Sequence, residues 1–152
     1  MSFDLVSSLV AYMRTNSDLV AAFNDSPSNP SFWSNYNALQ SSATDPIMPY
    51  LVFVEPQETK NYETADYTEN PSDQATGVLM ADIYAPNEAN LRALGEQVCG
   101  VLNDCDDVID GLFYFRRTTQ SFPPTPQTGP DASPTIFQRS IQFRYMYEEY
   151  LA

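Results

Sequence analysis

The chain has 152 residues and a mass of 17.1 kDa, and 43% of its residues are hydrophobic. A chain of this length can bury a core without metal or disulfide staples, so we expect one domain spanning residues 1–152. Twenty Asp and Glu residues against seven Lys and Arg residues give a net charge of −13. Such a surface repels nucleic-acid phosphates, and the chain has no basic helix face that would bind a membrane surface.

Several residue types needed for catalysis or export signals are absent or rare. The chain has no His, which removes the usual general base at neutral pH and the commonest nitrogen ligand of metals. Cys99 and Cys105 fall in a predicted helix and its exit, where a helix would separate them by about 9 Å along its axis. We therefore expect two free thiols in a reducing compartment.

The N-terminal stretch lacks the basic region of a signal peptide, and no apolar run reaches membrane-spanning length.

The N-terminal residues have the spacing of an amphipathic helix. Ser2 can cap this helix, Asp4 lies in its first turn, and apolar residues follow at helical spacing as far as Met13. Asn16 interrupts the pattern and caps a further turn or two that reaches Phe23. We expect one opening helix that is broken near Asn16.

The segment from Asn24 to Pro49 has the composition of a long loop. It carries four prolines among Ser, Asn and Asp residues. Phe32, Trp33, Tyr36 and Leu39 lie inside it at near-helical spacing, which favours a short helix or a packed loop. Trp33 is also a candidate contact residue.

Two strands and an acidic segment follow. Residues 50–54 (YLVFV) form an apolar, β-branched and aromatic run that predicts a buried strand. Residues 55–75 contain six acids and almost no aliphatic side chains, so they form either a solvent-projecting hairpin or a segment that orders against another chain. Residues 77–85 alternate, which predicts a second strand with an inward aliphatic face made of Leu79, Ala81, Ile83 and Ala85.

The C-terminal half predicts one helix and two more strands. Asn87 caps a helix whose apolar residues run from Leu91 to Leu102. Residues 112–121 and 135–147 have the pattern of strands, and the residues between them hold five prolines. The chain is therefore predicted to be α+β, with a largely antiparallel sheet of about four strands, two helices packed on one face, and long projecting loops.

The acidic residues after the predicted helix suggest calcium binding, but the sequence does not sustain that interpretation. Asp104 and Asp106 have the spacing that begins an EF-hand loop, whereas Val108 and Ile109 stand where a ligand and a glycine are needed. A solvated helix exit fits better. Because the sequence also lacks nucleophile and phosphate-binding motifs, we expect no enzyme activity, no metal and no cofactor.

Four of the seven basic residues fall on the last two predicted strands: Arg116, Arg117, Arg139 and Arg144. In so acidic a chain they are expected to form ion pairs, either within the chain or between identical chains. Acidic loops that meet a basic sheet edge would let copies join head to tail in a ring.

Several stretches together resemble the tail terminator, or tail completion, proteins of tailed bacteriophages. These are the opening helix with its DLVAAF tail, the PYLVFV strand, the strand-to-helix unit LMADIYAPNEANLRALGEQVCGVL, and the closing strand QRSIQFRYMYEE. The resemblance lies in element order and pattern and spans nearly the whole chain. The loops at residues 24–48 and 122–134 are longer than expected for this family.

The resemblance implies a structural virion protein of the neck, made in the host cytoplasm. Such a protein forms a hexameric ring that caps the tail tube, binds the head–tail connector and lets DNA pass through an acidic lumen. The alternatives are a head-side neck ring, a monomeric module that binds a peptide or small ligand, and a metal-dependent enzyme built on Asp104 to Asp110. Acidic residues expected at the lumen or at a neighbouring subunit are Glu58, Glu63, Asp66, Glu69 and Asp73. Residues expected at subunit or partner interfaces are Trp33, Tyr62, Tyr67, Phe122, Arg116 and Arg117. For the acidic residues and the four aromatic residues, a solvated loop or a core contact within the chain is the alternative.

Overall fold

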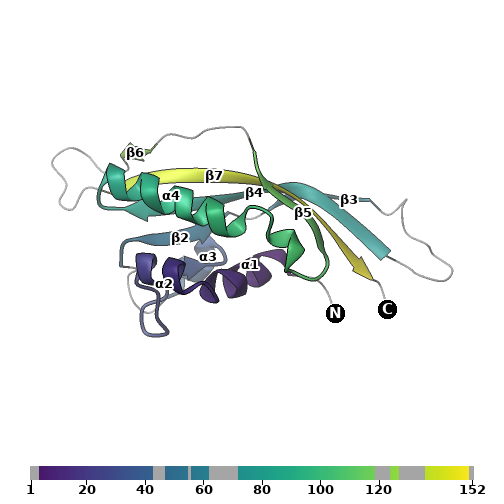
Figure 1. The fold of residues 1–152 in the computed structure, drawn as a ribbon, viewed down its shortest axis with the longest axis horizontal. Helices are drawn as coiled ribbons and strands as arrows, with labels where there is room; N and C mark the ends of the chain where they lie inside the picture. The colour runs from purple at the N-terminus through teal and green to yellow at the C-terminus, as the bar shows by residue number, and fades with distance from the viewer. Residues whose placement is uncertain are drawn as a thin grey trace.

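A seven-stranded sheet forms the centre of the molecule (Figure 1), in a computed structural model that describes residues 4–42, 47–54, 56–61, 72–118, 124–126 and 136–150. The strand order is β1-β2-β4-β7-β5, with β3 paired to β4 and β6 paired to β7. The helices are α1 (Leu5–Arg14), α2 (Ser17–Phe23), α3 (Tyr36–Gln40), α4 (Glu88–Leu102) and the 3₁₀ turn η2 (Cys105–Asp107). The strands are β1 (Phe32–Trp33), β2 (Tyr50–Phe53), β3 (Gln57–Asn61), β4 (Ser72–Ala85), β5 (Leu112–Arg117), β6 (Thr125–Pro126) and β7 (Phe137–Tyr150).

The longest pairing in the sheet joins β4 to β7. These antiparallel strands match residue for residue from Ser72 opposite Tyr150 to Ala85 opposite Phe137. The pairs β2–β4, β3–β4, β5–β7 and β6–β7 are also antiparallel, and β1–β2 is parallel. The α+β class is confirmed, but the sheet is larger than the predicted four strands because β1, β3 and β6 add to it.

One face of the sheet is buried beneath α1, α2 and α4, and we call the other the open face. The prediction that the helices pack on one face does not hold for α3, because Tyr36 of α3 binds Asp82 on the open face. The predicted inward residues of β4 are fully buried, as are Phe143 and Tyr145 of β7, while Phe137 is only partly buried. Helix α4 lies across β4 and β7, and α1 and α2 pack against α4 below β2 (Figure 1). All of them share one hydrophobic cluster. No helix within the described residues is long and apolar enough to cross a membrane.

Short polar side chains set where the helices begin. Asp4 is the N-cap of α1, since its carboxylate accepts a hydrogen bond from the Ser7 amide at 3.1 Å. The prediction that Asp4 lies inside the first turn is therefore wrong, and Ser2 lies outside the described residues. Asn16 caps α2 and Asn87 caps α4 through the same kind of bond, which confirms both the predicted break and the predicted start.

The predicted loops contain short elements, of which the sequence pattern indicated only a short helix near Tyr36 and Leu39, as one of two alternatives. Residues 24–49 include β1 and α3. The acidic segment 55–75 begins as β3, which pairs antiparallel with the first part of β4. The base of this segment is therefore a hairpin, which was one of the two predicted alternatives. Strand β5 ends at Arg117 rather than at Ser121, and β6 lies within the proline-rich segment. Strand β4 begins at Ser72 rather than at Gly77, and β7 begins at Phe137 and reaches Tyr150 rather than Tyr147, because the two strands pair with each other along their full length.

Both cysteines are free and buried, as expected. Cys99 lies on α4 and Cys105 on η2, and both belong to the core cluster. Burial raises the pKa of both thiols, and for Cys105 burial and the neighbouring Asp106 carboxylate raise the pKa to about 12.

Both thiols should therefore resist alkylation in the native protein. With a pKa of about 12, only about one Cys105 thiol in ten thousand is ionised at pH 8, and burial further limits access to it. We expect the iodoacetamide labelling of both cysteines to be slow in native buffer and fast in 6 M guanidinium, measured by mass spectrometry. Rapid native labelling of Cys105 would contradict this burial.

Candidate assembly surfaces

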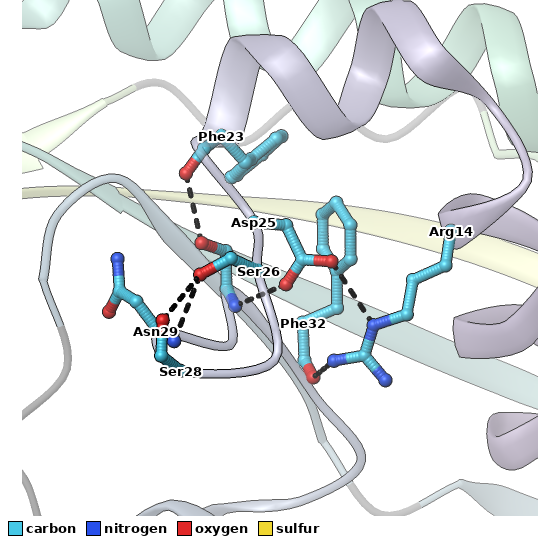
Figure 2. Close-up of polar contacts among 8 residues, drawn as sticks. Arg14, Phe23, Asp25, Ser26, Ser28, Asn29 and Phe32 are labelled. Atoms are coloured by element: carbon cyan, nitrogen blue, oxygen red, sulfur yellow. Dashed lines mark hydrogen bonds and ion pairs between the residues drawn. The ribbon is translucent and has the colours of Figure 1, made fainter.

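A buried carboxylate holds the segment between α2 and β1 in place. Asp25 accepts a hydrogen bond from the Ser31 amide at 2.7 Å and pairs with Arg14 at 3.2 Å (Figure 2). Arg14 also donates to the Phe32 carbonyl, and the Ser31 hydroxyl donates to the Phe23 carbonyl. The Asp25 side chain is only 6% exposed, so this charge is neutralised inside the fold and fixes the chain that enters β1.

This fixed segment forms one wall of a groove along α1. Two adjoining hollows, of about 330 and 420 Å³, share Ser7 and Ser34 in their walls. Trp33 lines the larger hollow with a partly buried side chain. Its indole Nε1 is buried and has no hydrogen-bond partner within the described residues. A buried N–H without an acceptor lowers the stability of the fold, and a hydrogen-bond acceptor on a partner would remove that penalty. The contact role of Trp33 stays a prediction, and the partner group it would need is a hydrogen-bond acceptor.

Glu58, at the base of the acidic hairpin, lies against the molecule's own sheet. Its carboxylate accepts hydrogen bonds from the hydroxyls of Tyr147 at 2.7 Å and Tyr145 at 3.3 Å. Gly77 makes room for this contact, because a Cβ there would lie 2.7 Å from the Tyr145 hydroxyl. Glu58 is exposed, and its predicted role at a lumen or a neighbour stays a prediction.

Most of the other hairpin residues lie outside the part of the chain that the structure describes. Asp73 belongs to β4 by its backbone pairing with Glu149, but its side chain is not described. The predicted site residues that fall outside the described ranges are Glu63, Asp66, Glu69, Tyr62, Tyr67 and Phe122.

Arg116 and Arg117 both form ion pairs within the chain. Arg116 pairs with Asp104 at 2.6 Å and with Asp106 at 2.5 Å, so its single charge is shared by two carboxylates of the acidic cluster considered above for calcium. Arg117 pairs with Glu96 of α4 at 3.3 Å. Hydrogen bonding to Asp106 raises the pKa of Arg116. Their predicted part in subunit interfaces stays a prediction, and within the chain they join β5 to α4 and η2.

Arg139 is a buried cation under helix α4. It is 8% exposed, donates to the Arg92 carbonyl at 3.2 Å and pairs with Glu96 at 3.0 Å. The Arg139 and Arg117 guanidiniums together lower the pKa of Glu96. The Arg139 side chain fits beneath the helix because position 95 is a glycine, and a Cβ there would overlap Nη1 of Arg139.

The open face of the sheet carries a buried polar cluster that the sequence pattern did not predict. Asp82 of β4 is 6% exposed and accepts hydrogen bonds from Tyr36 at 2.5 Å and from Ser140 at 2.6 Å. The Tyr36 hydroxyl also lies 2.6 Å from that of Tyr84, which stacks on Tyr50. Alternation along β4 already placed Asp82 beside Tyr84 on the outward face, but nothing in the sequence indicated that Tyr36 would cover them.

This cluster keeps its tyrosines protonated. Burial and the bonds to Asp82 and Tyr84 raise the pKa of Tyr36, and burial also raises the pKa of Tyr84 and Tyr50. These hydroxyls therefore act as hydrogen-bond donors that fasten α3 to the sheet. No group of three or more carboxylates and thiols within the described residues is placed to hold a metal ion.

Removing the Tyr36 hydroxyl should destabilise the fold measurably. In Tyr36→Phe the Asp82 carboxylate loses one of its donors, so we expect the free energy of unfolding in urea to fall by about 1–3 kcal/mol. Tyr12→Phe is the matched control, because the Tyr12 hydroxyl has no partner within the described residues. Equal losses in the two variants would contradict a role for the Asp82 cluster.

A methyl group added at position 95 should lower the stability of the fold, whereas one added at position 100 should not. Gly95→Ala forces the buried Arg139 guanidinium to move, and overpacking of this kind costs about 1–3 kcal/mol, which outweighs the gain in helix propensity of about 0.5–1 kcal/mol. Gly100 lies on the same helix, and a Cβ added there would meet nothing within 4 Å, so Gly100→Ala should instead stabilise the helix by about 0.5–1 kcal/mol. Thermal unfolding followed by circular dichroism measures both, and a Gly95→Ala variant as stable as Gly100→Ala would refute the packing described for Arg139.

Comparisons with known proteins give a likeness in fold without a likeness in sequence. No protein-family model matches the chain, and no curated protein matches it. A chain in the solved structure titled "Virion of native gene transfer agent (GTA) particle" superposes with a TM-score of 0.63 at 13% identity, and the alignment covers 95% of each chain. This chain therefore shares that fold across almost its whole length.

Proposed function

We propose that this protein is a structural subunit of a virion and that it acts as a tail terminator. The observation that supports this most directly is the likeness in fold, over 95% of both chains, to a component of a gene transfer agent virion. The element order that resembles phage tail terminators is independent support, since it comes from the sequence alone.

The polar chemistry of the molecule suits a scaffold. Asp25, Asp82 and Glu96 each bind donors from distant parts of the chain and fasten a loop, α3 or α4 in place. The free thiols are buried and protonated at neutral pH. These groups stabilise one rigid shape, which a subunit of a repeating assembly needs. We therefore propose a role without catalysis and without a cofactor.

The finer proposal is a ring, expected to be a hexamer, that caps the tail tube and joins it to the head connector. A net charge of −13 supports a lumen through which DNA slides without being held, because like charges repel at short range. The protein would then reside in the neck of the virion, with tail tube protein on one side and connector on the other. A head-side neck ring would share these features and is the nearest alternative.

A monomeric binding module is the alternative from a different class, and one observation favours it. Trp33 lines the groove along α1, and its indole Nε1 has no acceptor in the described part of the chain. A peptide carbonyl bound in the groove would pair with this N–H once the indole turned toward it, because Nε1 is buried in the unbound structure. The mass in solution and the effect on tail tubes separate these functions.

The test combines light scattering with electron microscopy. We expect a species of about 100 kDa, six copies of the 17.1 kDa chain, over a concentration series. Mixed with purified tail tubes of the same particle, the protein should cap tube ends and stop their elongation, while untreated tubes keep growing.

Other outcomes reject the proposal in distinct ways. Rings that bind isolated connectors but leave tubes uncapped would assign the protein to the head side. A species of 17.1 kDa that neither assembles nor caps tubes would reject the ring and favour the binding module.

A further inference from the structure

Part of the open face carries side chains that belong in a contact rather than in water. The large hydrophobic residues that are well exposed within the described ranges are Ile47, Val108, Phe113, Tyr114 and Met146. Tyr114 of β5 lies opposite Met146 of β7 on the open face, and these residues are 40% and 37% exposed. Phe113, next to Tyr114 at the irregularity in β5, is 53% exposed. We call these three residues together with Arg144 and Thr118 the β5 patch.

Arg144 gives the β5 patch a positive charge that nothing within the described residues neutralises. It lies on the open face, since its neighbours Phe143 and Tyr145 are buried on the other face. Arg144 pairs in register with Arg116, so two like charges lie across the strands. Arg116 is neutralised by two carboxylates and its guanidinium lies over the Tyr114 ring at 5.1 Å, whereas Arg144 is exposed and has no ion pair in the described part of the chain.

Part of the β5 patch lines a hollow of a size that suits one acidic side chain. A surface pocket of about 230 Å³ is lined by Tyr114, Thr118 and the three guanidinium-bearing residues Arg116, Arg117 and Arg144. Because Arg116 and Arg117 already hold carboxylates of their own chain, Arg144 is the cation available to an incoming anion. Aromatic residues, Met and Arg are the types enriched in protein interfaces.

The main-chain edge of β5 does not offer the same opportunity. The Phe115 carbonyl accepts from the Asp104 amide, and the Arg117 amide donates to the Asn103 side chain. These bonds occupy main-chain groups of β5 that a further strand would need. A partner would therefore meet the side chains of the open face and would not extend the sheet.

We propose that the β5 patch binds an acidic side chain of a second copy of this chain, with Arg144 as its ion-pair partner. Charge complementarity selects this occupant, because a copy with a net charge of −13 presents carboxylates over much of its surface. A basic patch that meets an acidic surface elsewhere on the neighbour makes a head-to-tail contact, which closes into a ring when the rotation permits. This proposal rests on the proposed function only because it assumes that the protein self-assembles. The β5 patch is the surface that would drive that self-assembly.

The test is charge reversal at Arg144 with a matched reversal elsewhere. Arg144→Glu should weaken self-association by about a hundredfold, because it places like charges together, and should leave a species of 17.1 kDa in light scattering. Arg92→Glu is the control and should keep the mass of the wild type, since Arg92 is also an exposed arginine, on α4, and its side chain pairs with Glu88 one turn away.

Circular dichroism confirms that each variant is folded, and each outcome decides the proposal. It is overturned if Arg144→Glu keeps the wild-type mass, if Arg92→Glu dissociates equally, or if the wild type is a monomer at every concentration. It is also overturned if Arg144→Glu keeps its mass but loses retention of double-stranded DNA, which would make the β5 patch a phosphate site. Wild-type rings that cap tail tubes while Arg144→Glu rings also persist would reject this surface and leave the proposed function standing.

Discussion

Fourteen residues of β4 pair with fourteen residues of β7, and the rest of the structure is positioned by that ladder. Because successive side chains in a strand point to opposite faces, one register decides which residues face the helices and which face outward. It places Leu79 and Phe143 together in the core, and Val78 and Arg144 together on the open face. A slip of one residue would exchange the two sets.

The loops and small elements are attached to this ladder by polar contacts. Asp82 binds Tyr36 of α3 on the open face, Glu58 of β3 binds two tyrosines of β7, and Glu96 joins α4 to Arg117 and Arg139. Each contact neutralises or satisfies a group that burial would otherwise penalise. Against this internal pairing, the Trp33 indole and the Arg144 guanidinium stand out as polar groups that lack a partner within the described ranges.

An acidic subunit that assembles with copies of itself must overcome the repulsion of its own charge. Most of its few cations are used inside the fold, where they offset carboxylates of the same chain. An uncompensated cation set among exposed aromatic and Met side chains supplies attraction locally while the overall charge still repels nucleic acid. In the proposed ring, self-assembly and the free passage of DNA would then be compatible.

The sequence by itself determined the elements whose signals are local. Alternation identified the inward face of β4, helical spacing with Asn87 identified α4, and the spacing of the cysteines indicated free thiols. Only the tertiary structure decided which distant residues meet: β1, β3 and β6 exist because a neighbouring strand pairs with them, and Asp82 is buried because Tyr36 covers it. Among the four strand arginines, sequence could not tell Arg144 from those already paired, because ion pairs form between residues far apart along the chain.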